Sequence, residues 1–241
     1  MTEFVGILGK DFCGSTIMSR VLNAVDGVAS IGEVFWVVDA PEDRGRCTLH
    51  GEGCPYIDPA RTDPTTNDKN LYARLAEQFD ASHLVVSDKH FYYYDRFIPT
   101  GNLHAIVMFK NPMAFLASDV RNIQKYSTWT LGTWRNNYNV ILRRLGELKS
   151  WVVVDLDLFA REPGAQIRRV CRSIGVDPVI AGNLFVPFCN VGGNGHARGS
   201  EKIFVDDRWI TELPMAEKVT MMGAKDVWET YFRLLELSRC E

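Results

Sequence analysis

Residues Gly9 to Thr16 (Gly-Lys-Asp-Phe-Cys-Gly-Ser-Thr) have the composition and spacing of an anion-binding loop. The loop directly follows an apolar run of strand length and directly precedes a segment with helical periodicity. Small residues let backbone N–H groups converge on a phosphate or sulfate, and the helix N-terminus adds the positive end of its dipole. The sequence therefore predicts an anion site formed by Lys10, Cys13, Gly14, Ser15 and Thr16.

The same residues also fit a tight strand-to-helix turn capped by Ser15. The spacing is that of the loop Gly-x4-Gly-Lys-Ser/Thr, but Ser15 stands where that motif has its lysine. Because the lysine normally spans the β- and γ-phosphates, its absence argues against hydrolysis of Mg-ATP. The sequence context favours the anion site over the simple turn.

Charged side chains directly follow three further apolar runs of strand length. Glu33 follows the second predicted strand, Lys89 the third and Lys110 the fourth. Right-handed crossovers make these strands parallel to the first, so their carboxyl ends share the edge that carries the loop. A charge after a strand is usually only solvated, but ligands of open α/β sheets bind beyond this edge. The coincidence predicts a binding site.

The helix after Lys110 offers a second set of anion ligands. Ser118 lies about two turns into this helix, and Arg121 lies three residues further on the same face. Lys110, Ser118 and Arg121 thus form a candidate second phosphate site. Taken alone, a packed serine and a solvated arginine would be the more common arrangement.

The elements that position these residues alternate between strands and helices. The predicted strands cover 4–8, 28–31, 83–87, 104–109 and 151–155, and the predicted helices cover 15–25, 71–79, 112–123, 131–148, 163–174 and 226–237. Such alternation predicts an α/β fold with a parallel sheet covered by helices. A length of 241 residues predicts a single domain over 1–241, with a polar surface insertion at about 39–68.

The composition excludes several classes of protein. With 46% hydrophobic and 24% charged residues, the chain is neither disordered nor fibrous. A net charge of −3 provides no overall basic field for nucleic acid or an anionic membrane, so an anionic ligand needs a local cluster. No segment resembles a signal peptide or a membrane span. We expect a cytoplasmic protein that binds neither nucleic acid nor membranes; its oligomeric state stays open.

Taken in order along the chain, these motifs resemble the bacterial-type sulfotransferases that use 3′-phosphoadenosine 5′-phosphosulfate (PAPS). The similarity is carried by Gly14-Ser-Thr with Gly32-Glu33, Asp88-Lys89, Lys110 with Ser118, Val154-Asp-Leu-Asp-Leu, Gly193-Asn194 with Arg198, Asp206-Asp-Arg-Trp209 and Cys47-x2-His50-Gly51-x2-Cys54-Pro-Tyr. It implies a P-loop-NTPase-like three-layer sandwich. The chain departs from the family at two positions. The arginine of the family's loop is absent, so Lys10 must replace it. Lys110 stands where the family has an arginine, which keeps the positive charge but loses the bidentate geometry of a guanidinium.

The resemblance also implies roles for the candidate residues. The loop would hold the 5′-phosphosulfate, and Lys110, Ser118, Arg121 and Arg198 would hold the 3′-phosphate. Lys89, with Lys10, would neutralise the leaving oxygen, and Glu33 would be the general base, with His90 and His196 as other candidates.

The reaction that these roles imply transfers a sulfuryl group from PAPS to a hydroxyl or amine of a small-molecule or carbohydrate acceptor, and it requires no metal. Two alternatives stay open. One is a nucleotide-dependent kinase, against which the missing loop lysine argues. The other is a non-catalytic adenine-nucleotide-binding module.

Cys47, His50 and Cys54 carry metal-binding groups at close spacing. A closed zinc site needs four ligands, and no fourth ligand stands near these three in the sequence. Zinc, a disulfide and free thiols therefore stay open, and no metal ligand is assigned. Cys13, Cys171, Cys189 and Cys240 are scattered, and we expect them to be structural.

The remaining candidates are aromatic. Phe91 to Tyr94, Trp36, Trp129 and Trp134 could line a pocket for an acceptor, because sugars and phenols pack on aromatic faces. Packing in the core is the default expectation for most of them.

Overall fold

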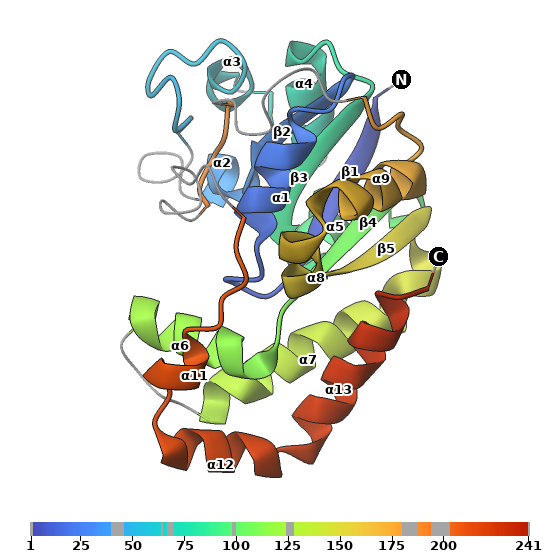
Figure 1. The fold of residues 1–241 in the computed structure, drawn as a ribbon. Helices are drawn as coiled ribbons and strands as arrows, with labels where there is room; N and C mark the ends of the chain where they lie inside the picture. Colours follow the sequence, from blue (N-terminus) through green and yellow to red (C-terminus); the bar gives the residue numbers. More distant parts are fainter. Residues whose placement is uncertain are drawn as a thin grey trace.

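The computed structural model describes residues 2–39, 46–63, 65–66, 70–97, 100–123, 128–179, 188–193 and 203–240. Its strands are β1 (Glu3–Gly9), β2 (Val28–Gly32), β3 (His83–Lys89), β4 (Leu103–Phe109) and β5 (Ser150–Asp155). They form a five-stranded sheet in the order β2-β3-β1-β4-β5, and every pairing is parallel (Figure 1). The predicted α/β fold with a central parallel sheet is confirmed. The order also makes the loop after β1 a neighbour of the ends of β3 and β4.

The helices that cover the sheet are α1 (Ser15–Leu22), α2 (Phe35–Asp39), α3 (Asp58–Thr62), α4 (Leu71–Gln78), α5 (Phe91–Phe97), α6 (Pro112–Ile123), α7 (Thr128–Arg144), α8 (Leu156–Arg161), α9 (Pro163–Ile174), α11 (Trp209–Glu212), α12 (Met215–Gly223) and α13 (Lys225–Leu237), with 3-10 turns at Thr100–Asn102 and Leu145–Glu147. The predicted helices 112–123 and 163–174 match α6 and α9. The prediction missed α2, α3, α5, α8, α11 and α12. Most of these are too short to show a helical period in the sequence.

Alternate residues of each strand pack on opposite faces of the sheet. In β4, Ile106 and Met108 join a core that includes α1 and α9, whereas Val107 and Phe109 join a core that includes α7 and α13. The ribbon in Figure 1 shows the helices on either side of the sheet. Because both faces are covered, all seven residues of β4 are buried, which accounts for its unbroken apolar sequence.

The polar stretch at 39–68 contains more packed structure than its composition predicts. Cys47, Cys54, Ile57 and Ala60 are buried in the core that packs on the α4 side of the sheet. Residues 40–45, 64 and 67–69 of this stretch lie outside the described residues.

The end of β2 is fastened to the segment 188–193. Val191 donates its N–H to the carbonyl of Ile31 and accepts the N–H of Glu33, both at 2.8 Å. Gly32 lies between them with φ of +79°, and a Cβ there would be 2.1 Å from Asn190 Oδ1 and 2.4 Å from the Val191 carbonyl. Only glycine permits this conformation and this close approach of the two segments.

The substitution Gly32→Ala is therefore expected to destabilise the protein by about 3 kcal/mol or more, from the strained φ and from overpacking. Gly175→Ala is the matched control, because Gly175 has φ of +78° but nothing within 4 Å of an added Cβ. The control is expected to cost only about 1 kcal/mol. Urea unfolding of both variants measures the difference, and equal losses would contradict the steric argument.

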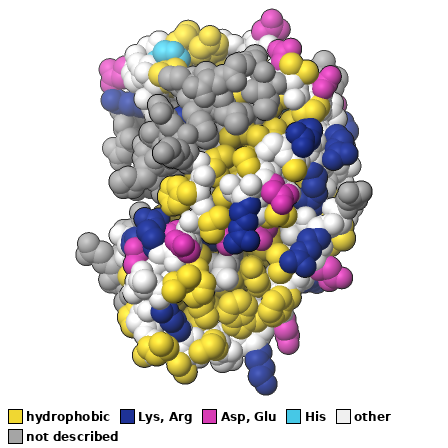
Figure 2. All heavy atoms as spheres, in the orientation of Figure 1, with side chains coloured by type: hydrophobic (Ala, Val, Ile, Leu, Met, Phe, Trp, Pro, Cys, Tyr) yellow, Lys and Arg dark blue, Asp and Glu magenta, His cyan; other side chains and the backbone are white. Residues whose placement is uncertain are grey.

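The surface of the described residues shows no dominance of one charge on the face seen in Figure 2. Basic and acidic side chains are interspersed across the middle of this face, and hydrophobic side chains gather over its lower part. This distribution agrees with the near-neutral net charge of −3. Among the described residues, none of the helices combines the length and apolar character needed to cross a membrane.

Candidate active site

The loop between β1 and α1 leaves the first turn of the helix without a side-chain cap. The N-cap is Gly14, with φ of +93°, and it has no side chain to bond to the first amides of α1. A Cβ at Gly14 would lie 2.6 Å from Leu156 Cδ1, so a larger residue would displace the loop. The interpretation of Ser15 as the cap is therefore wrong. Ser15 and Thr16 lie at the start of a helix whose positive end remains available to an anion.

Two side chains of helix α7 form hydrogen bonds with the backbone of the loop between β1 and α1. The N–H of Lys10 donates to Tyr138 Oη at 3.2 Å, and Asn137 Nδ2 donates to the Gly9 carbonyl at 2.6 Å. His90 donates in turn from Nδ1 to Asn137 Oδ1 at 2.6 Å, and burial lowers its pKa. His90 is thus part of the loop's support, and its role as an alternative base stays a prediction. Sequence analysis missed Asn137 and Tyr138, because no local motif distinguishes them from other helix residues.

Cys13 is a buried member of the loop. Its side chain is buried among β1, α1 and β4, and burial raises the pKa of its thiol. Its N–H donates to the Lys10 carbonyl at 3.1 Å. Cys13 thus shapes the loop from the core side, and its predicted contact with a ligand stays a prediction.

Glu33 and Lys89 form a largely buried ion pair at the sheet edge. Lys89 Nζ contacts Glu33 Oε1, and the two side chains are only 14% and 10% exposed. The second carboxylate oxygen of Glu33 accepts the indole N–H of Trp36 at 2.9 Å. Burial lowers the pKa of Lys89, but the charges of Glu33 and Asp11 outweigh it and raise that pKa above its usual range. Lys89 is therefore a fixed positive charge.

Asp11 completes this charged cluster. Its carboxylate lies 2.8 Å from Lys10 Nζ and 3.5 Å from Lys89 Nζ. Burial raises the pKa of Asp11, but the charges of Lys89 and Lys10 outweigh that effect and bring it to about 2. An anionic ligand entering the loop would meet the ammonium groups of Lys10 and Lys89. In the ligand-free protein both of these groups lie beside the carboxylate of Asp11.

Asp88 serves the structure of the edge rather than ligand binding. It is buried, accepts the N–H of Phe35 at 3.2 Å and contacts the hydroxyl of Tyr72. Burial raises its pKa to about 7. Asp88 thus joins the end of β3 to the start of α2, which places Glu33 opposite Lys89.

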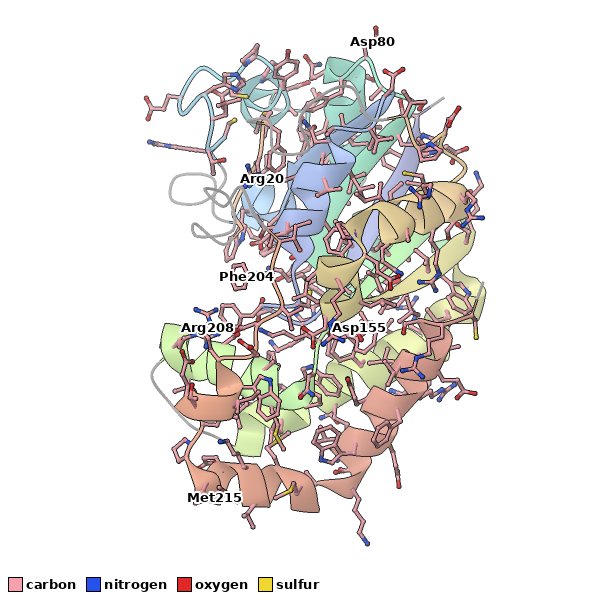
Figure 3. The ribbon with its side chains drawn as sticks, in the orientation of Figure 1. Arg20, Asp80, Asp155, Phe204, Arg208 and Met215 are labelled. Atoms are coloured by element: carbon pink, nitrogen blue, oxygen red, sulfur yellow. The ribbon has the colours of Figure 1, made fainter. Side chains whose placement is uncertain are left out.

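The second predicted cluster also assembles. Lys110 Nζ donates to Ser118 Oγ at 2.5 Å, and Arg121 Nη2 donates to the same oxygen at 2.9 Å. Asp206 lies against all three, at 2.7 Å from Arg121, 3.4 Å from Ser118 and 3.9 Å from Lys110. Arg208, labelled in Figure 3, donates from Nε to the other oxygen of Asp206 at 2.8 Å. The carboxylate of Asp206 thus lies among the three groups of the predicted phosphate site.

Burial has a large effect on Lys110. It lowers the pKa of the ammonium group to about 8, although the charge of Asp206 acts in the opposite direction. Arg121 faces the same group and disfavours its protonation. Lys110 is therefore a cation whose charge depends on the anion beside it.

The segment 188–193 closes one side of the site. A Cβ at Gly192 would lie 2.9 Å from Glu33 Oε2, and one at Gly193 would lie 3.1 Å from Thr16 Oγ1. The two glycines therefore lie directly on the candidate base and on the anion loop. Arg198 and His196 fall outside the described residues, so their predicted roles stay predictions.

The aromatic candidates divide between core and site. Trp134 and Tyr94 are fully buried in the core. Phe35 stacks on Tyr93 with ring centroids 4.1 Å apart, and Trp36 lies 4.3 Å from Phe35. Because Trp36 also holds Glu33, these three rings form an aromatic wall beside the ion pair. The side chain of Trp129 is not among those described.

Comparisons with known proteins identify the architecture. No family model matches the chain, and no curated protein matches it in sequence. A solved structure does match, the sulfotransferase domain of the olefin synthase from Synechococcus PCC 7002, with a TM-score of 0.64. The match covers 95% of this chain and 94% of that domain at 19% identity. This chain has a sulfotransferase fold. The predicted three-layer α/β architecture is thereby confirmed over nearly the whole chain.

In a sulfotransferase fold of this kind, the edge that carries the loop after β1 gathers the charged residues described above. Glu33, Lys89 and Lys110 come from three strands of the sheet and all lie at this edge. At 19% identity the comparison shows the fold alone, so the chemistry must be argued from these side chains.

Proposed function

We propose that this protein is a sulfotransferase that moves the sulfuryl group of PAPS to a hydroxyl or amine of a small-molecule or carbohydrate acceptor. The observation that supports the proposal is the pair of candidate anion sites at one sheet edge, with the Glu33–Lys89 pair beside the first. One site is the uncapped start of α1, and the other is the cluster around Lys110. A donor with separate 5′ and 3′ phosphate groups has use for both sites.

The 5′-phosphosulfate would lie on the first turn of α1. The amides of Ser15 and Thr16 and their hydroxyls would donate to its oxygens, in the manner of other helix N-termini that bind phosphate. Lys10 and Lys89 would supply positive charge from the two sides of the loop. The 3′-phosphate would displace the carboxylate of Asp206 from Lys110, Ser118 and Arg121.

Glu33 would act as the general base. As the acceptor oxygen forms its bond to sulfur, the bond from sulfur to the bridging oxygen breaks, and adenosine 3′,5′-bisphosphate leaves. Glu33 takes the proton of the acceptor, and Lys89 stabilises the negative charge on the departing oxygen. Because the donor-free protein pairs these two side chains, Lys89 must turn toward the donor, which frees Glu33 Oε1 for the acceptor proton.

Lys110 predicts how donor binding depends on pH. Its pKa of about 8 means that it loses its charge as the pH rises through that value, whereas Asp206, whose pKa is lowered, remains ionised. Binding of a 3′-phosphate favours the charged form, so affinity is lost on the alkaline side. We expect adenosine 3′,5′-bisphosphate to bind up to about tenfold more weakly at about pH 9 than at about pH 7.

Titration calorimetry at several pH values measures this dependence. The matched control is Lys110→Arg, whose guanidinium stays charged over the whole range, so its affinity should be nearly independent of pH. A wild-type affinity that is constant from about pH 7 to about pH 9.5 would contradict the assignment of Lys110 to the 3′-phosphate.

Two measurements test the proposed function itself. Adenosine 3′,5′-bisphosphate should raise the melting temperature more than ATP or ADP, because only the former has a 3′-phosphate for Lys110. Incubation with labelled PAPS and a panel of hydroxyl and amine acceptors should add one sulfuryl group to a member of the panel. Preference for ATP would indicate a kinase, and binding without any transfer would indicate a nucleotide-binding module.

A further inference from the structure

Three cysteines and a histidine bring their ligand atoms together outside the candidate active site. The Sγ atoms of Cys47, Cys54 and Cys189 and a ring nitrogen of His50 all lie within 4.8 Å of one another. The three thiols are buried, and the imidazole lies at the surface. Cys189 is 135 residues from Cys54 in the sequence, so the fold supplies from a distant segment the fourth ligand group that is missing near the other three.

The spacing of these atoms fits a tetrahedral metal ion. Cys47 Sγ lies 3.4 Å from His50 Nδ1 and 3.3 Å from Cys189 Sγ. Cys54 Sγ lies 3.5 Å from His50 Nδ1 and 3.4 Å from Cys189 Sγ. Zinc bonds of about 2.3 Å to sulfur and about 2.0–2.1 Å to nitrogen give tetrahedral edges of about 3.5–3.8 Å. These four distances differ from the tetrahedral edges by at most about half an ångström, and all six lie within 4.8 Å.

The arrangement does not favour a disulfide. Cys189 is at almost the same distance from Cys47 and from Cys54, at 3.3 and 3.4 Å, so the fold selects neither pair. A bond between any two of the thiols would leave the third beside the imidazole of His50 with no partner. Three sulfurs and one nitrogen directed at a common centre form a ligand set typical of a structural metal site.

The backbone around the cluster supports thiolates. The N–H groups of Leu49 and His50 point at Cys47 Sγ, the latter at 3.5 Å, and those of Tyr56 and Ile57 point at Cys54. Such donors hold metal-binding thiolates in place in the same way as other outer-shell groups.

We propose that Cys47, His50, Cys54 and Cys189 bind a structural zinc ion as a closed Cys3His site. Four protein ligands leave no open coordination position, so the ion would stabilise the fold and take no part in sulfuryl transfer. The site lies apart from the residues assigned to the donor and depends on none of them.

The zinc would fasten the 46–54 segment to the residues that hold Glu33. Cys189 is two residues before Val191, which bonds to Glu33 and Ile31 across the end of β2. Cys47 also bridges to Val191, and the N–H of Thr48 donates to the Asn190 carbonyl at 2.7 Å. Loss of the ion would therefore loosen the same segment whose glycines lie on the candidate base.

Metal analysis of the full chain, purified with reductant and without chelator, tests the proposal. We expect one zinc per chain in the wild type and less than a tenth of that in Cys189→Ser. Cys171→Ser is the matched control, because Cys171 is equally buried but lies in the core of the other sheet face. His50→Cys should retain zinc, because it exchanges one zinc ligand for another. A metal-free wild type, or iron in place of zinc, would overturn the proposal.

A second measurement avoids the variants, since Cys189→Ser could fail to fold. A mercurial reagent titrated into the wild type should release one zinc, detected with a colorimetric chelator, as it consumes the thiolates of the site. An intact mass under non-reducing conditions that is two hydrogens too low, without zinc, would show a disulfide and overturn the proposal. Neither measurement uses a sulfate donor, so the zinc site and the proposed function can fail separately.

Discussion

Replacement of Glu33 by glutamine is expected to lower the turnover number of sulfuryl transfer by about 10²- to 10⁴-fold, the usual contribution of a positioned general base. Glutamine has nearly the same shape and can still accept the indole N–H of Trp36, which lies 2.9 Å from the carboxylate. What it lacks is the capacity to take the acceptor's proton. Binding of adenosine 3′,5′-bisphosphate should change little, because the 3′ cluster around Lys110 is untouched.

The measurement is the steady-state rate with the acceptor found in the panel, together with calorimetry for the bisphosphate. Glu77→Gln is the matched control, because Glu77 is an exposed glutamate that pairs with Arg74 on the same helix. Its rate should equal that of the wild type. If Glu33→Gln also retains the wild-type rate, Glu33 is not the base.

Lys89→Met is expected to have the second large effect, a fall of about 10²- to 10³-fold in turnover. This is the usual cost of removing one group that stabilises developing charge in a transition state. Methionine keeps most of the length of the side chain and bears the same backbone cost at φ of +62°. The loss should therefore appear mainly in kcat and only modestly in the affinity for adenosine 3′,5′-bisphosphate.

Lys149→Met controls for the loss of one ammonium group, because Lys149 forms an exposed ion pair with Glu3 at 2.8 Å. The double variant of Glu33 and Lys89 adds a sharper test. The two side chains touch in the donor-free protein, so their effects should combine to less than the product of the single losses. Equal turnover in Lys89→Met and Lys149→Met would remove Lys89 from the mechanism.

The zinc proposal gives these experiments a common check. Glu33 is held by Val191, which lies two residues from a proposed zinc ligand. A preparation that has lost zinc would have low turnover without any change at Glu33 or Lys89. Metal content should therefore be measured for each variant before its rate is interpreted.

The five strands, and the sheet edge at which the candidate site residues gather, could be predicted from the amino-acid pattern alone. Buried strands read as short apolar runs because both faces of the sheet are covered, and this pattern identified all five strands. Parallel strands end at the same edge, so Glu33, Lys89 and Lys110 could be placed together from their positions in the chain alone. The spacing of Ser118 and Arg121 predicted a shared helical face. In the structure Arg121 donates to the hydroxyl of Ser118, which also accepts a hydrogen bond from Lys110.

The contacts between side chains from distant segments became visible only in the folded structure. Glu33 and Lys89 are 56 residues apart, Ser118 and Asp206 are 88 apart, and Cys54 and Cys189 are 135 apart. Local periodicity records which face a residue occupies, but it carries no information about a partner on a distant segment. For that reason the sequence showed Cys47, His50 and Cys54 as possible metal ligands but did not show Cys189 beside them. It likewise predicted the cluster of Lys110, Ser118 and Arg121 but not the contact of Asp206 with it.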